Sequence, residues 1–375
     1  MKFVVEKDKL LKAVNSVAKA VAVRTTTPIL EGILIQTNDN NDIKLTCYDQ
    51  ELGIEYIIHD CDIKEQGAIV VNATMFGEII RKLPDADIDI EVNNKNLLVI
   101  ECENSLYKLA TMNADEYPEL PEFTIENTVT IEQNTLKEMI TKTIFAISIE
   151  ENRPIFTGCL FEINNNVLNV VAVDGFRLAW KQKNLTESVN NFSAVIPGRT
   201  LSELNKIIAD NLDTVKIGVS KNQALFEIEN CKIVTRLLEG EFLNYSKVIP
   251  ENWETRVRVN RALIMNCFDR ISLISSSSIE KEKKYPVKIN VDTKGIKISC
   301  TNQTGDAKEE LIVTTEGKEL EAGFNPKYFL DVLRNIDDEE VYIDFGSAIS
   351  PCIVRSVEDD GDYKYMILPI RLKND

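Results

Sequence analysis

Two kinds of hydrophobic pattern alternate along the chain. Segments whose apolar residues recur every three or four positions predict amphipathic helices. Shorter runs rich in β-branched residues, in which apolar and polar residues alternate, predict strands. The expected helices span roughly residues 7–24, 72–83, 132–144, 198–210, 260–271 and 325–336. Strand-like runs such as 33–37, 43–47 and 54–58 lie between them, which indicates an α+β protein.

The expected helices recur with a fixed period. Asp8, Asn134 and Asn260 stand at matching places in three similar segments and are separated by 126 positions each time. A second set of helices repeats at intervals of 125 and 128 positions. This period is far longer than that of a solenoid repeat, so each copy can bury its own core. The pattern predicts three structurally similar domains, each with two helices packed on antiparallel sheets.

Proline-containing segments mark the expected domain boundaries. Prolines occur in the stretches 117–122 and 249–252, where they end the preceding elements. We therefore expect domains at residues 1–122, 127–250 and 254–375.

Charge is distributed unevenly over the expected elements. The net charge of −17 alone argues against an ordinary nucleic-acid-binding surface, which would be basic. The six expected helices, however, hold fifteen basic and eight acidic residues, a net charge of +7, which leaves −24 for the strands and loops. This asymmetry predicts a protein that meets a polyanion only on its helical side.

Residue types that support catalysis are scarce. The chain has one histidine, His59, and contains no GxxxxGK[ST], GxGxxG, GxSxG or HExxH motif. The acidic pair Asp359 and Asp360 could bind a metal or act in acid–base chemistry. Among 60 acidic residues such adjacency is expected by chance. We expect no enzymatic activity, no cofactor and no metal site, and the scarcity of catalytic residue types disfavours the alternative of a hydrolase.

The cysteines indicate a reducing compartment. All eight are scattered, none forms a CxxC pair, and most lie within apolar runs, as expected of free buried thiols. The chain has no run that resembles a signal peptide, and none approaches the roughly 18 apolar residues of a membrane span. We therefore expect a cytoplasmic protein with no membrane partner.

Several short motifs occur in a fixed order along the whole chain. They are TPIL at 27–30 after Arg24, AVDGFRLA at 172–179, LEGEF at 238–242, GFN at 323–325 and YMILPIRL at 365–372. Through these motifs and their spacing the chain resembles the bacterial β sliding clamps, the β subunits of DNA polymerase III. The resemblance implies a DNA-clamp fold and a head-to-tail homodimeric ring of six similar domains, with helices lining the hole. Each chain would form half of this closed ring.

The resemblance implies that the ring encircles duplex DNA and makes the polymerase processive. Dispersed Lys and Arg side chains would attract phosphates without reading sequence. The candidate DNA-facing residues, by helix membership or family position, are Lys12, Arg24, Lys137, Arg153, Arg199 and Arg270. This chain has Thr74 where many clamps have a basic residue.

The resemblance also implies a hydrophobic pocket between the second and third domains. It would receive short linear peptides of the replicative polymerase, the clamp loader and repair proteins. The matching residues are Val173, Gly175, Phe176, Arg177, Leu178, Leu243, Lys247, Val248, Pro351, Met366, Leu368, Pro369, Ile370 and Arg371. The chain departs from the family at Phe176, usually histidine, and at Leu243, commonly proline. Both keep the pocket apolar and bear on which peptides fit.

For ring closure, the resemblance pairs an edge strand of the first domain with the third domain of a second copy. The matching residues are Lys82, Tyr107 and Leu109 on one side and Leu273, Ile274, Glu309 and Glu310 on the other. A scaffold that binds only proteins is the alternative reading. It would retain the repeats and the pocket but would not need basic helices.

Overall fold

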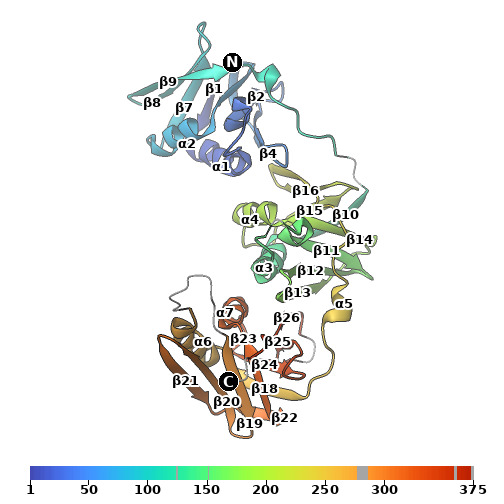
Figure 1. The fold of residues 1–375 in the computed structure, drawn as a ribbon. Helices are drawn as coiled ribbons and strands as arrows, with labels where there is room; N and C mark the ends of the chain where they lie inside the picture. Colours follow the sequence, from blue (N-terminus) through green and yellow to red (C-terminus); the bar gives the residue numbers. More distant parts are fainter. Residues whose placement is uncertain (124–125, 151, 277–285, 359–360, 373–375) are drawn as a thin grey trace. The chain divides into compact units, whose positions relative to one another are not determined.

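The computed structural model describes residues 1–123, 126–150, 152–276, 286–358 and 361–372. They form two compact units: unit 1 comprises residues 1–136 and 199–237, and unit 2 comprises residues 137–198 and 238–375. Figure 1 shows the helices and sheets of each.

Unit 1 is organised by one antiparallel sheet of thirteen strands, in the order β10-β15-β16-β17-β4-β3-β2-β6-β9-β8-β7-β1-β5. The strands are β1 (Lys2–Glu6), β2 (Gly32–Thr37), β3 (Ile43–Tyr48), β4 (Leu52–Ile58), β5 (Asp62–Glu65), β6 (Ala68–Asn72), β7 (Asp87–Val92), β8 (Leu97–Cys102), β9 (Ser105–Met112), β10 (Asn127–Glu132), β15 (Thr214–Val219), β16 (Gln223–Ile228) and β17 (Cys231–Arg236). The pairing of β4 with β17, in which Ile54 faces Ile233, makes the first and second repeats share a sheet.

Unit 2 contains a nine-stranded sheet, in the order β14-β11-β12-β13-β26-β25-β24-β18-β22, and a four-stranded sheet, β21-β20-β19-β23. The strands are β11 (Gly158–Asn164), β12 (Val167–Val173), β13 (Arg177–Asn184), β14 (Phe192–Pro197), β18 (Thr255–Asn260), β19 (Val287–Asp292), β20 (Gly295–Asn302), β21 (Gly305–Leu311), β22 (Thr314–Gly317), β23 (Leu320–Phe324), β24 (Glu340–Phe345), β25 (Cys352–Ser356) and β26 (Tyr363–Ile367). Here β13 pairs with β26, so the second and third repeats also share a sheet.

The helices begin where the sequence repeats predict. They are α1 (Lys7–Val17), α2 (Ala73–Lys82), α3 (Gln133–Ile144), α4 (Gly198–Ile207), α5 (Tyr245–Val248), α6 (Arg261–Ser276) and α7 (Pro326–Arg334). Asn72 and Asn325 cap α2 and α7, because each side-chain oxygen accepts a backbone N–H of the first turn. In the third repeat, the buried rings of Phe268 on α6 and Phe329 on α7 stack at 4.5 Å. The predicted α+β clamp architecture is confirmed.

The first helix is shorter than predicted. It ends at Val17, a single 3-10 turn follows at Ala18–Ala20, and Val21 is extended. The segment that follows is rich in β-branched residues, which lose side-chain freedom in a helix, and Pro28 disfavours helical geometry at the residue before it. Arg24 therefore lies outside the helix, in contrast to the sequence-based prediction.

All eight cysteines are buried and unpaired, as predicted. Burial raises the pKa of the Cys159 thiol to about 12, so the thiol stays protonated and unreactive. Within the described ranges no helix is long and apolar enough to cross a membrane. The same part of the chain holds no cluster of His, Cys, Asp and Glu suited to a metal ion. The pair Asp359 and Asp360 lies outside the described residues.

Candidate functional site

One face of the nine-stranded sheet in unit 2 carries an apolar cluster. Strand register places Val173 beside Leu178, Leu178 beside Met366, and Met366 beside Ile353, on four neighbouring strands. Because side chains alternate between the two faces of a sheet, these four point the same way. The buried members of the apolar cluster are Leu160, Val171, Val173, Leu178, Val195, Ile353 and Met366.

The buried members form the floor of the cluster, and half-buried apolar side chains form a rim around it. The rim includes Phe242, Leu243, Val248 and Leu368, which pack against the cluster while remaining partly exposed. The structure thus brings together six of the residues that the resemblance assigned to a peptide pocket. They are Val173, Leu178, Leu243, Val248, Met366 and Leu368. The rim is where a ligand could reach the cluster, since the floor itself is nearly inaccessible.

Phe176 stands at the tip of the turn between β12 and β13. Asp174 fixes this turn, because its Oδ1 accepts the backbone N–H groups of both Phe176 and Arg177. Gly175 adopts φ +92, a conformation that favours glycine. The Phe176 side chain is 58% exposed, and its ring stacks on Tyr328 of α7 at 6.4 Å. The turn therefore presents an aromatic surface.

Arg177 lies inside the fold and is only 9% exposed. Its Nη1 donates to Asp331 at 2.5 Å, its Nε to Asp174 at 3.0 Å, and its Nη2 to the Phe145 carbonyl at 2.7 Å. The guanidinium also lies 4.9 Å from the ring centroid of Tyr328. With these partners, Arg177 acts as a cross-link beneath the turn.

The remaining predicted pocket residues are more exposed. Pro351 and Pro369 are half-buried, whereas Lys247, Ile370 and Arg371 are exposed. The Ile370 backbone N–H donates to the Gly323 carbonyl at 2.8 Å, which fixes the C-terminal segment along β23.

The helical elements keep the charge asymmetry predicted from sequence. Within their observed bounds the six long helices hold thirteen basic and six acidic residues, a net charge of +7. Several of these cations form exposed ion pairs, such as Lys12 with Glu229 at 3.9 Å and Arg270 with Glu309 at 2.6 Å. Exposed pairs of this kind are weak, so a phosphate could compete for the cation.

Two candidate DNA-binding arginines share a cavity in unit 1. Arg24 and Arg199 line a space of about 550 Å³ together with Asp49, whose carboxylate forms an ion pair with Arg199 at 2.5 Å. Arg24 is exposed and has no ion-pair partner among the described residues. Arg153 precedes a 3-10 turn and is exposed, and Lys137 is half-buried on α3. Among these six candidates, Arg24 is the cation most available to a phosphate in unit 1.

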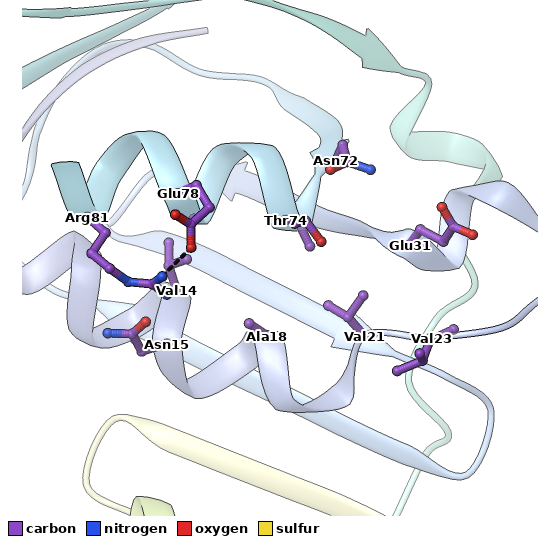
Figure 2. Close-up of a pocket in the computed structure, with 13 residues that line it drawn as sticks. Val14, Asn15, Ala18, Val21, Val23, Glu31, Asn72, Thr74, Glu78 and Arg81 are labelled. Atoms are coloured by element: carbon purple, nitrogen blue, oxygen red, sulfur yellow. Dashed lines mark hydrogen bonds and ion pairs between the residues drawn. The ribbon is translucent and has the colours of Figure 1, made fainter. Parts of the chain in front are cut away.

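A second cavity lies between α1 and α2 (Figure 2). Its volume is about 410 Å³, and Thr74 lies on its wall. The charged residues that line it are Glu31, Glu78 and Arg81, and Arg81 is ion-paired with Glu78. With two carboxylates and one guanidinium, this cavity is unsuited to a phosphate.

Two strands offer backbone groups for pairing with another chain. Residues 105–110 of β9 pair only with β8, and β21 pairs only with β20, among the residues described. Tyr107 is exposed, whereas the Leu109 side chain is 8% exposed and packs within its own domain, so Leu109 offers its backbone.

Beside the β21 edge, Leu273 of α6 is 70% exposed and Ile274 is half-buried. The charged residues predicted for this interface already have neighbours of opposite charge. Lys82 lies 3.5 Å from Glu78, Glu309 bonds to Arg270, and Glu310 lies 2.7 Å from Lys308.

Three family models match successive parts of the chain. They describe the N-terminal, central and C-terminal domains of the DNA polymerase III beta subunit and match residues 1–121, 130–244 and 246–371. The beta sliding clamp of Bacillus subtilis is 34% identical over 381 residues, with 99% of this chain and 100% of the relative covered. That of Staphylococcus aureus is 33% identical, with 99% of each covered.

Solved structures give the same result. A putative DNA polymerase III beta subunit from Eubacterium rectale is 38% identical, with a TM-score of 0.93 over 99% of this chain and 100% of that one. A sliding clamp from Pseudomonas aeruginosa bound to griselimycin is 28% identical, with the same TM-score and coverage. The chain belongs to the bacterial β sliding clamps, the beta subunits of DNA polymerase III.

Proposed function

We propose that the chain forms half of a head-to-tail homodimeric ring that encircles duplex DNA and tethers the replicative polymerase and other partner proteins. The ring would contain six domains, three from each chain, with the boundaries expected from the sequence. The observation that carries this proposal is the segregation of charge: helices of net charge +7 in a sliding-clamp chain of net charge −17. Dispersed, exposed cations attract phosphates without holding any one of them firmly, which suits sliding.

The open edges of β9 and β21 support ring closure. Joining β9 of one chain to β21 of a second would extend both sheets and satisfy strand-edge backbone groups that have no strand partner among the described residues. The same contact repeated by symmetry would close a dimer. Exposed Tyr107 and Leu273 would then become buried apolar contacts of this interface.

The apolar cluster of unit 2 supports the tethering role. A buried floor with a half-exposed apolar rim suits two or three apolar side chains of an extended peptide. Partners would be captured by such peptides, and the chain itself would act as a mobile tether without a chemical step. A scaffold that binds only proteins would use the same cluster but leaves the basic helices unexplained.

Mass and shape in solution test this proposal. Sedimentation velocity should give twice the 42.4 kDa of one chain, and electron micrographs of the same sample should show rings with a central hole. A monomer at micromolar concentration, or a dimer without a hole, would contradict it.

A further inference from the structure

A cavity of about 420 Å³ adjoins the apolar cluster in unit 2. Ile353 belongs to the cluster and also lines this cavity. Val248 and Ile249, which pack against the cluster, are followed in the chain by Pro250, which lines the cavity. On the strands, Arg355 lies beside Lys364, and Arg256 lies beside Asp344. A peptide that reaches the cluster can therefore continue into the cavity.

The cavity wall is a stack of arginine and aromatic side chains. The Arg256 guanidinium lies 4.4 Å from the ring of Trp253 and 4.4 Å from that of Tyr342. Arg355 lies 5.1 Å from the same tyrosine ring. Such cation–π contacts hold the guanidinium planes in place, so their remaining donors are fixed before any ligand arrives.

Asp344 anchors both arginines. This carboxylate, 8% exposed, accepts from Arg256 Nε at 2.6 Å, from Arg256 Nη2 at 2.8 Å and from Arg355 Nε at 3.0 Å. Arg256 Nη1 has no acceptor among the described residues. The anchoring therefore leaves guanidinium donors for a further acceptor.

Lys364 adds a cation that no carboxylate neutralises within the described chain. Its Nζ lies 5.6 Å from the ring centroid of Trp180, which itself packs against the apolar cluster. The lining holds three cations, Arg256, Arg355 and Lys364, against the carboxylates of Asp344 and Glu251. The excess positive charge favours one anionic group, in a chain whose net charge is −17.

We propose that Arg256, Arg355 and Lys364, here called the carboxylate site, bind an aspartate or glutamate side chain of a partner peptide whose apolar residues occupy the apolar cluster. This inference rests on the proposed peptide-binding function. A single carboxylate matches the single excess charge, and forked guanidinium donors suit its geometry. A DNA backbone fits poorly, because exposed Glu251 in the lining would repel the further phosphates of an extended polyanion. The site would select peptides by an acidic residue next to their apolar anchors.

Peptides selected from a random library serve as the probe of the carboxylate site. A random library displayed on phage is selected against the wild-type chain and against Lys364→Gln. Wild-type selections should enrich peptides with Asp or Glu at a fixed spacing from the apolar anchors, and the variant should enrich the anchors alone. No acidic enrichment on the wild type would overturn the proposal.

A pair of synthetic peptides measures the coupling between the acidic side chain and Lys364. One enriched peptide is made with its C-terminus amidated, together with its Glu→Gln or Asp→Asn counterpart, so that only the side chain differs. Amide replacement should weaken binding to the wild type about tenfold and to Lys364→Gln less than twofold. Lys364→Arg should restore the preference. An equal loss on all three proteins would overturn the carboxylate site.

Two controls separate the possible failures. Lys183→Gln removes an exposed lysine from the other face of β13 and should behave as the wild type. Leu368→Ala should weaken both peptides alike if they occupy the cluster. If Leu368→Ala leaves binding unchanged, the peptides do not bind at the apolar cluster. If it weakens binding but the Lys364→Gln protein still distinguishes the acidic peptide from its amide counterpart as the wild type does, only the carboxylate site is wrong. Displacement of the acidic peptide by short duplex DNA, lost in Lys364→Gln, would also overturn the assignment.

Discussion

Arg177 on β13 donates a hydrogen bond of 2.5 Å from Nη1 to Oδ2 of Asp331 on α7, 154 residues further along the chain. The pair joins the second sequence repeat to the third beneath the exposed Phe176 turn. Removing one partner of a buried ion pair costs more than the pair contributes, because the other charge remains without compensation. Asp331 should therefore be important for stability, although it lies on a helix surface.

Asp331→Asn should lower the free energy of unfolding of unit 2 by about 1–3 kcal/mol. The amide keeps the shape of the carboxylate but removes the charge that faces Arg177. Asp269→Asn is the matched control, since Asp269 forms an exposed pair with Arg334 at 3.2 Å. That change should cost at most about 0.5 kcal/mol. Urea unfolding followed by tryptophan fluorescence measures both, and equal effects would contradict the role of Arg177.

Leu273→Asp should convert the proposed dimer to monomers. The proposed interface would bury this exposed leucine, and a buried unpaired carboxylate is strongly unfavourable. Leu263→Asp on the same helix, also an exposed leucine, is the control and should leave the dimer intact. Sedimentation velocity at micromolar concentration distinguishes the outcomes. A dimeric Leu273→Asp protein with normal circular dichroism would contradict the proposed contact between β9 and β21.

Arg24→Ala should weaken binding to duplex DNA by a similar factor for every sequence tested. Because one phosphate contact is lost, the slope of log K against log salt should become less steep by about 1. Arg258→Ala removes a sheet arginine paired with Glu340 at 2.5 Å and should leave the slope unchanged. Fluorescence anisotropy over a series of salt concentrations gives both slopes. An unchanged slope for Arg24→Ala would remove this residue from the DNA-facing set.

The ion pairs of Lys142 should make stability depend on pH. The hydrogen bond from Lys142 lowers the pKa of Asp337 below its ordinary value of 3.8. A carboxyl group whose pKa is lowered by folding stabilises the fold above its unfolded pKa, and this contribution is lost as the pH falls through the folded value. Lys142→Met should therefore lower Tm at pH 7, and the difference from the wild type should shrink below about pH 4.

Lys327→Met is the control for this titration, because Lys327 is an exposed helix lysine without an ion pair in the described part of the chain. Its effect on Tm should be small and independent of pH. A Lys142→Met difference that stays constant from pH 3 to pH 7 would rule out the titration of these pairs as its cause.

Much of the fold follows from patterns within single segments. The helix starts at Lys7, Gln133 and Arg261 could be predicted because amphipathic spacing repeats with the domain period. The end of the first helix could not, since the apolar spacing continues through Val21 and Val23 while their β-branched side chains favour extended backbone. The spacing of apolar residues indicates which face of a helix is buried but predicts the end of the helix less well.

Contacts between distant segments could not be predicted from the sequence. The resemblance assigned Arg177 to a peptide pocket, but its burial depends on Asp331 and the Phe145 carbonyl, which only the fold brings near. The carboxylate site was missed for the same reason. A weak signal existed, because Arg256 and Asp344 each alternate with apolar residues on strands of one repeat. Strand register is needed to place them side by side.

In the proposed ring, DNA is held by topology and not by tight contacts. The protein is loaded by its cognate clamp loader onto nicked circular plasmid, separated from free protein by gel filtration, and half of the sample is then linearised with a restriction enzyme. We expect circular DNA to retain the protein and linear DNA to lose it within minutes, because the ring slides off the ends. Equal retention on circular and linear DNA would contradict the ring.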